Sequence, residues 1–172
     1  MRGIIHTRRR ALIVLAVLII AVFSTFLFSR IVLQKVTGED MPEIIRLTLE
    51  RALVQGEIPA YELIKDKESI VLSTKNIDPN LIPKIPEVNF IFLDPERIQE
   101  KAEREGDFLY LRFNQVKIED FRVLVSLDNT WAVSEENRTK GIGYLCGGGF
   151  TIEYSKDFFG RLVSKAISGW IS

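Results

Sequence analysis

The sequence predicts an α+β protein: one N-terminal transmembrane helix, then a curved antiparallel sheet, a meander, with helices on one face. Three observations predict this class. The first is an uncharged apolar run over residues 11–29, and the second is a pair of capped, helix-like segments at 41–55 and 95–105. The third is a run of strand-like segments after residue 107, in which apolar and polar residues alternate most clearly over 121–134. Helices followed by a block of strands are typical of α+β domains.

The apolar run begins at Ala11 and ends at Ser29, and residues 31–33 extend it past Arg30. About 20 helical residues, at about 1.5 Å each, cross a hydrocarbon core of about 30 Å. We therefore predict a transmembrane anchor at 11–33. A cleaved signal peptide is the competing interpretation, but its apolar region usually spans about 7–15 residues and ends in a small-x-small site, which this segment lacks.

The charges around this run predict its orientation. Several arginines and no acidic residue precede it, and basic residues favour the cytoplasmic side of a membrane. We therefore expect a basic cytoplasmic N-terminus at 1–10, a connector at 34–40 and an extracytoplasmic α+β domain at 41–172. The predicted location is the cell membrane, crossed once, with the C-terminal domain outside the cytoplasm.

The composition limits the partners of the domain. The chain has 23 basic (Lys and Arg) and 23 acidic residues, but five arginines and no acid lie in residues 1–30, which leaves the remainder with a net charge of −5. We expect no nucleic-acid partner, because attraction to phosphates supplies most of that affinity. Cys146 is the only cysteine, so no disulfide forms within the chain.

The first half of the domain is expected to hold two helices and two strands. The helices, at 41–55 and 95–105, each begin after an Asp that can cap the helix and a proline in the first turn. A short strand is predicted at 69–74, and an apolar, β-prone segment at 88–93 is predicted to be a buried strand. Prolines between these strands indicate a loop.

The second half is expected to be a four-stranded meander. Its strands are predicted at 108–116, 121–134, 148–155 and 162–171, with a polar loop at 134–142. The second strand is long compared with the usual 5–6 residues or so, and we expect it to bend or bulge near residues 128–129.

Two pairs of residues are candidate binding residues. Asn129 and Trp131 share the apolar face of the long strand, and they either line a ligand pocket or leave the buried Asn bonded to backbone at a bulge. Phe158 and Phe159 occupy a predicted hairpin tip between Asp157 and Gly160. Either one ring covers the edge of the sheet, or the pair contacts a partner protein or lipid, because aromatic anchors dominate interface energies.

The stretch Tyr144–Tyr154 (YLCGGGFTIEY) and the ending Ser168–Ser172 (SGWIS) resemble small uncharacterised bacterial proteins with a GGGF strand, a Gly-containing hairpin and a terminal WIS. The resemblance runs from about Ser69 to the end. It implies no activity and no catalytic residues. Many of these proteins have Ser at the position of Cys146, which weakens a case for thiol chemistry.

Several kinds of chemistry are excluded or disfavoured. The one histidine, His6, precedes the apolar run, so a Ser-His-Asp or Cys-His unit cannot form in the domain. The sequence lacks clustered zinc ligands and a calcium loop, and we predict no metal and no cofactor. The glycines at 147–149 are interpreted as a bulge or as the close approach of another backbone. The acids Glu119, Asp120 and Asp128 are interpreted as solvated turn and strand-end residues.

Two functional hypotheses remain. The first is a membrane-anchored, non-enzymatic module whose exported domain binds a protein or a small ligand. The second is a small hydrolase-like enzyme that uses two carboxylates in a cone-shaped pocket. The missing histidine and metal ligands favour the first hypothesis, whereas paired carboxylates with a raised pKa would favour the second.

Overall fold

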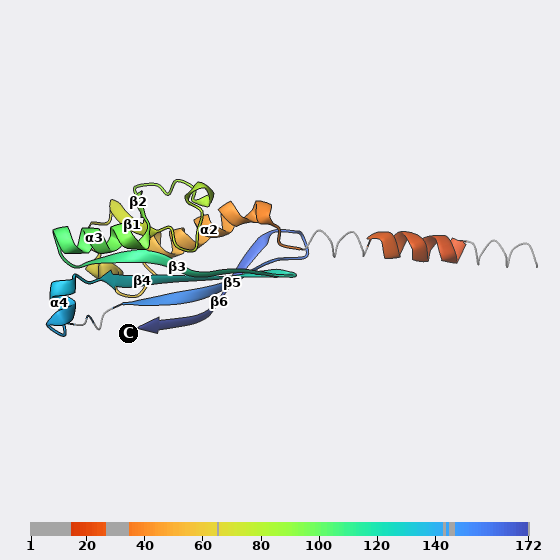
Figure 1. The fold of residues 1–172 in the computed structure, drawn as a ribbon. Coiled ribbons are helices and arrows are strands. Elements are labelled where there is room, and N and C mark those ends of the chain that lie inside the picture. The colour runs from red at the N-terminus through yellow and green to blue at the C-terminus, as the bar shows by residue number, and fades with distance from the viewer. Residues whose placement is uncertain (1–14, 27–34, 65, 143, 145–146, 172) are drawn as a thin grey trace, which may run out of the picture.

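The computed structural model describes residues 15–26, 35–64, 66–142, 144 and 147–171. It is a mixed α+β fold with a six-stranded sheet (Figure 1). The strands are β1 (Ser69–Ser73), β2 (Asn89–Leu93), β3 (Phe108–Glu119), β4 (Arg122–Ala132), β5 (Gly148–Lys156) and β6 (Leu162–Ile171). The helices are one over residues 15–26, α2 (Met41–Leu49), α3 (Pro95–Glu105) and α4 (Glu135–Thr139).

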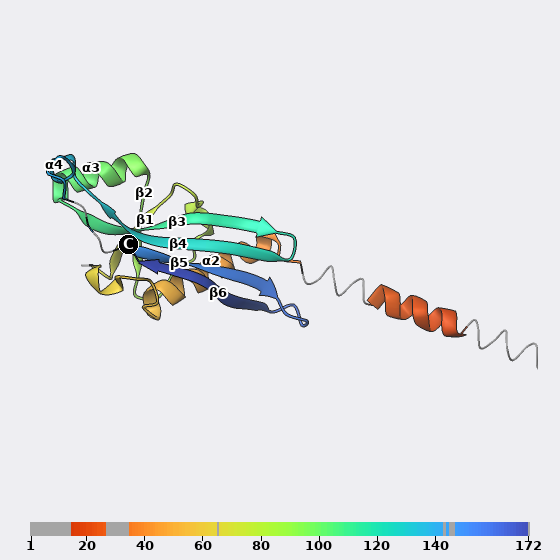
Figure 2. The ribbon, with the colours of Figure 1, turned by 90° about the horizontal axis from the view of Figure 1, so that it is seen from below.

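The sheet has the strand order β2-β1-β3-β4-β5-β6. The last four strands form the predicted antiparallel meander, seen side by side in Figure 2. The prediction of an antiparallel sheet is wrong for the other strands, because β1 runs parallel to both β2 and β3. Parallel neighbours need a crossover connection, and the proline-containing segment 74–88 provides it between β1 and β2.

Helix α2 covers one face of the sheet and forms most of the core with it. It continues without a break into a π-helical turn, η2 (Glu50–Val54). Its apolar residues pack with Leu111, Phe113 and Leu127, which are fully buried. The sequence predicts this helix because its apolar residues recur at the helical period.

Helix α3 packs on the opposite face, so the prediction that helices cover one face only is wrong. Its Ile98 packs with Val71 and Ala132, whereas Ile70 and Leu72 belong to the core under α2. Successive residues of a strand point to opposite faces, which places the two helices on opposite sides of the sheet. The physical reason is that β1 is apolar on both faces, as strands with parallel neighbours commonly are.

The predicted membrane anchor is contradicted. Among the described residues, no helix is long and apolar enough to cross a bilayer. Within 11–33 the structure describes residues 15–26, which are helical. The same finding overturns the predicted location in the cell membrane with an exported C-terminal domain, since that location depended on the anchor. The rest of 11–33 lies outside the described residues, as do residues 1–10.

Two local predictions in the second half are also corrected. The segment 134–142, predicted as a loop, contains the short helix α4. The irregularity expected in β4 lies instead in the neighbouring strand, where the register shifts between Phe113 and Gln115 of β3. An extra residue on either strand of a pair bends the ladder, so the bend or bulge that we expected in β4 corresponds to the extra residue in β3.

The glycines that begin β5 confirm the prediction of a close backbone approach. A Cβ on Gly148 would lie 2.4 Å from the Trp170 carbonyl oxygen and 2.6 Å from Cβ of Pro59. A Cβ on Gly149 would lie 2.5 Å from Oδ1 of Asp128. These positions therefore need glycine for space rather than for phosphate binding.

Candidate functional site

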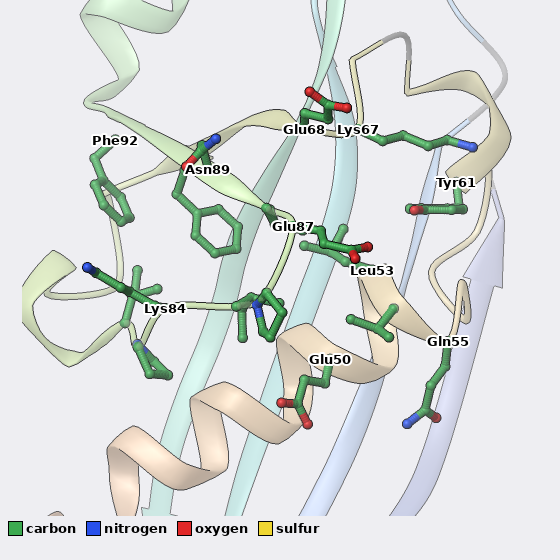
Figure 3. A pocket seen from close by; sticks show the side chains of 17 residues that line it. Glu50, Leu53, Gln55, Tyr61, Lys67, Glu68, Lys84, Glu87, Asn89 and Phe92 are labelled. Carbon is green, nitrogen blue, oxygen red and sulfur yellow. The ribbon is translucent and has the colours of Figure 1, made fainter.

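A cavity of about 1100 Å³ opens between the C-terminal end of α2 with η2, the segment 82–88 and strand β2 (Figure 3). Residues 61, 67 and 68 close its far side. We call this cavity the β2 groove. Its volume is slightly above the range of about 300–1000 Å³ that is usual for small-molecule sites.

Aromatic rings line the β2 groove. The ring centroids of Phe90 and Phe92 are 6.1 Å apart, and Phe90 packs against the core while Phe92 is 38% exposed. Across the cavity, Nζ of Lys67 lies 4.5 Å from the centre of the Tyr61 ring (Figure 3). This cation–π contact fixes a flat apolar wall opposite the two phenylalanines.

The backbone edge of β2 runs along this groove. Strand β2 is at the end of the sheet and pairs with β1 alone among the described strands. On the β1 side, the Asn89 N–H donates to the carbonyl of Glu68 (2.7 Å), and the Leu93 carbonyl also accepts a hydrogen bond there. Alternate residues of a strand face the same neighbour, so the N–H and C=O groups of Phe90 and Phe92 point away from the sheet. The edge therefore offers two donors and two acceptors to a further strand.

Glu87 enters the groove from a strained turn. The Val88 N–H donates to the Ile85 carbonyl (3.3 Å), Pro86 occupies the first central position, and Glu87 follows with φ of +65°. This is the pattern of a type II turn, in which the second central residue is usually glycine. Figure 3 shows the Glu87 carboxylate within the cavity. An exposed glutamate is thus held where glycine would be less strained.

The charges around the groove are mixed. Lys84 lies on one side and Lys67 on the other, with Glu87 between them (Figure 3). Glu50 also lines the cavity, and its carboxylate accepts a hydrogen bond from Arg46. Such a lining suits a polar, extended ligand better than a compact apolar one.

The described carboxyl groups with clearly shifted pKa values do not line this groove. Among the described residues, each carboxyl group whose pKa clearly departs from its usual value has a lowered pKa, held down mostly by hydrogen bonds. A general acid at neutral pH needs a raised pKa instead. The described part of the chain also contains no group of three His, Cys, Asp or Glu that could hold a metal ion.

The predicted pair Asn129 and Trp131 lies outside the β2 groove. Asn129 is fully buried, and its Nδ2 donates to the Pro59 carbonyl at 3.1 Å, which confirms a backbone partner although no bulge occurs there. Trp131 is half-buried and stacks on Tyr144, with ring centroids 4.0 Å apart. The Tyr144 hydroxyl donates to Asp107 (2.7 Å). Trp131 also lines a separate cavity of about 270 Å³, so its binding role stays a prediction.

The predicted pair Phe158 and Phe159 lies at the tip of the β5–β6 hairpin. The side chains are 57% and 70% exposed, and their rings meet edge to face with centroids 5.6 Å apart. The turn is fixed by Asp157, whose Oδ1 accepts from the Phe159 N–H at 2.8 Å. Both rings therefore stay accessible, and their role as a partner contact stays a prediction.

The three acids considered from the sequence do not share one environment. Glu119 pairs with neighbouring cations at a strand end, as expected. Asp128 is only 1% exposed, so its interpretation as a solvated acid is wrong. Its Oδ2 accepts from Arg112 at 3.1 Å, while its Oδ1 has no hydrogen-bond partner among the described residues. Asp128 thus belongs to an ion pair with Arg112 on the face opposite α2. His6 and Cys146 lie outside the described residues.

The residues that build the β2 groove were not predicted from the sequence. The segment 88–93 is predicted to be a buried strand, yet Ile91 and Phe92 are 40% and 38% exposed. Its shortness and the prolines before it are signals of an edge strand that could have shown this. No sequence pattern predicts the contact between Tyr61 and Lys67, because this contact depends on how a loop folds across the groove.

No family model, no curated protein and no solved structure matches this chain. The resemblance to small bacterial proteins drawn from the sequence gains no support from these comparisons and stays a prediction.

Proposed function

We propose that this domain is a protein-binding module that captures an extended segment of a partner protein along the free edge of β2. The observation that carries the proposal is the outward direction of the Phe90 and Phe92 backbone groups beside the β2 groove. An extended segment that adds to a sheet edge gains main-chain hydrogen bonds, and pockets beside the edge select its alternate side chains.

The groove supports this proposal through its shape and chemistry. A strand laid beside β2 would direct every second side chain toward the face that holds Phe90, Phe92 and Leu53. Lys67, Lys84 and Glu87 stand around that space and can select polar residues of the segment. Within β2 itself no charged residue or proline blocks a further strand, and Ile91 and Phe92 are exposed.

The experiment selects ligands from a displayed library of random peptides of about twelve residues, which is longer than a typical strand, with the full chain as bait. Binding of the selected peptides is then compared between the wild-type chain and two variants, Phe92→Ala and Phe92→Pro. Both variants lose the ring, but only proline also removes the outward N–H. Proline is tolerated at an edge where the N–H faces solvent.

We expect Phe92→Ala to weaken binding about tenfold, and Phe92→Pro to weaken it a further two- to tenfold or so, the value of one hydrogen bond. A matched control is Phe121→Ala, which removes an exposed ring from the turn between β3 and β4 and should leave binding unchanged. Selection of no peptide, or peptides that bind all three variants equally to wild type, would contradict the proposal.

A further inference from the structure

Strand β6 forms the other edge of the sheet, and it is unusually exposed. It lies at the far side of the meander from β3 (Figure 2). Nine consecutive residues, 163–171, are exposed, and they include Val163, Ile167, Trp170 and Ile171, the last at 79%. The strand has ten residues, no proline and a single charge, on Lys165. A long apolar edge of this kind normally pairs with another strand.

The two faces of β6 can be read from its pairing with β5. Lys165 opposite Glu153 and Ser168 opposite Thr151 point to the face that also holds Trp170. The register shifts between Thr151 and Ile152, so Ile167 is an extra residue and the alternation reverses there. Val163 and Trp170 therefore share one face, whereas Leu162 and Ile171 share the other.

This reversal makes β6 complementary to itself. When two copies run antiparallel about a two-fold axis between residues 166 and 167, Val163 meets Trp170 of the second copy on one face. Leu162 meets Ile171 on the other face. Lys165 meets Ser168, so the only charged side chains avoid each other. Like charges placed directly opposite would destabilise such a pair.

We infer that the chain forms a two-fold dimer through β6, in which two six-stranded sheets join edge to edge. The partner is a second copy because the register matches both faces and separates the charges without any further component. A two-fold contact uses the same patch on both copies and closes at two, so it leaves no β6 edge free for further growth. The β2 edges stay open at the two ends of the joined sheet.

Two substitutions at one exposed position test this inference. Ser168→Lys places a second lysine opposite Lys165 of the other copy twice per dimer, and Ser168→Glu places a glutamate there instead. The dissociation constant of the full chain is measured by sedimentation velocity from about 1 to about 100 μM. We expect Ser168→Lys to raise the constant and Ser168→Glu to lower it, each by about two- to thirtyfold from two cross-strand pairs.

The two variants are expected to shift the dissociation constant in opposite directions. A folding defect would not do this, since both variants lose the same side chain from the same strand. In a mixture of isotope-labelled and unlabelled Ser168→Glu chains, a carbodiimide should also join Lys165 of one chain to the introduced glutamate of another. A wild-type chain that stays monomeric throughout this range would overturn the inference. Dimerisation with the same constant in all three chains would overturn it as well, because the contact would then lie elsewhere.

Discussion

Replacing Glu87 with glycine should stabilise the domain, although it removes a side chain. Glu87 has φ of +65°, a left-handed conformation that costs an ordinary residue about 1–2 kcal/mol. Glycine relieves this strain, but its greater conformational entropy in the unfolded chain lowers the free energy of unfolding by about 0.4–1 kcal/mol. The net gain is therefore about 0.5–1 kcal/mol, since no hydrogen bond or ion pair of the described residues holds the Glu87 carboxylate.

The assay is urea unfolding of the full chain, followed by tryptophan fluorescence. With a slope of about 2 kcal/mol per molar urea, the midpoint should rise by about 0.3–0.5 M. Glu87→Ala is the matched control, because it removes the same carboxylate and keeps the strained conformation, so its midpoint should not rise. A fall in the midpoint for Glu87→Gly, or an equal rise for Glu87→Ala, would refute the strain argument. Glu87→Gly should also weaken capture of those selected peptides that carry a basic residue at the groove.

Three further changes test the packing and the electrostatics. Gly149→Ala should destabilise the domain by about 1–3 kcal/mol, because its Cβ would lie 2.5 Å from a carboxylate oxygen and 2.7 Å from a carbonyl oxygen. Gly169→Ala is the control, because among the described residues its Cβ would have no neighbour closer than 3.7 Å, and chemical unfolding measures both variants. Tyr154→Phe should cost about 1 kcal/mol in the same assay, because it removes the buried 2.9 Å hydrogen bond to Thr48. Burial alone would raise the pKa of Asp107, but the hydrogen bonds to its carboxylate outweigh burial and lower this pKa from 3.8 to about 2. The ionised carboxylate therefore contributes its full stabilisation above about pH 4, and this contribution is lost as pH falls through 2. Asp107→Asn should therefore flatten the loss of stability between about pH 4 and 2, and an unchanged acid profile would contradict this assignment.

The parts of the fold that the sequence predicted well are those with local signals. Helix α3 begins where Asp94 caps it, and Oδ1 of that residue accepts from the Arg97 N–H at 2.8 Å. Strand β4 alternates apolar and polar residues because one of its faces packs under α2. Caps and alternation act within a few residues, so a single sequence is enough to identify them.

The parts that the sequence missed depend on long-range arrangement. The parallel pairing of β1 with β2 and β3 leaves no pattern in strands that are apolar on both faces. The β2 groove is assembled from segments near residues 50–55, 61–68 and 82–92, which meet only when the crossover folds back over the sheet. The apolar run at 11–29 was the strongest local signal, yet no helix among the described residues is long and apolar enough to cross a membrane.

The most direct test of the proposed function is amide hydrogen exchange at β2, measured by NMR on the full chain with and without a selected peptide. Phe90 and Phe92 point their N–H groups away from β1, whereas Asn89 already donates to the Glu68 carbonyl at 2.7 Å. We expect saturating peptide to slow exchange at Phe90 and Phe92 by about tenfold or more and to leave exchange at Asn89 unchanged. Binding of the peptide with unaltered exchange at Phe90 and Phe92 would contradict capture along this edge.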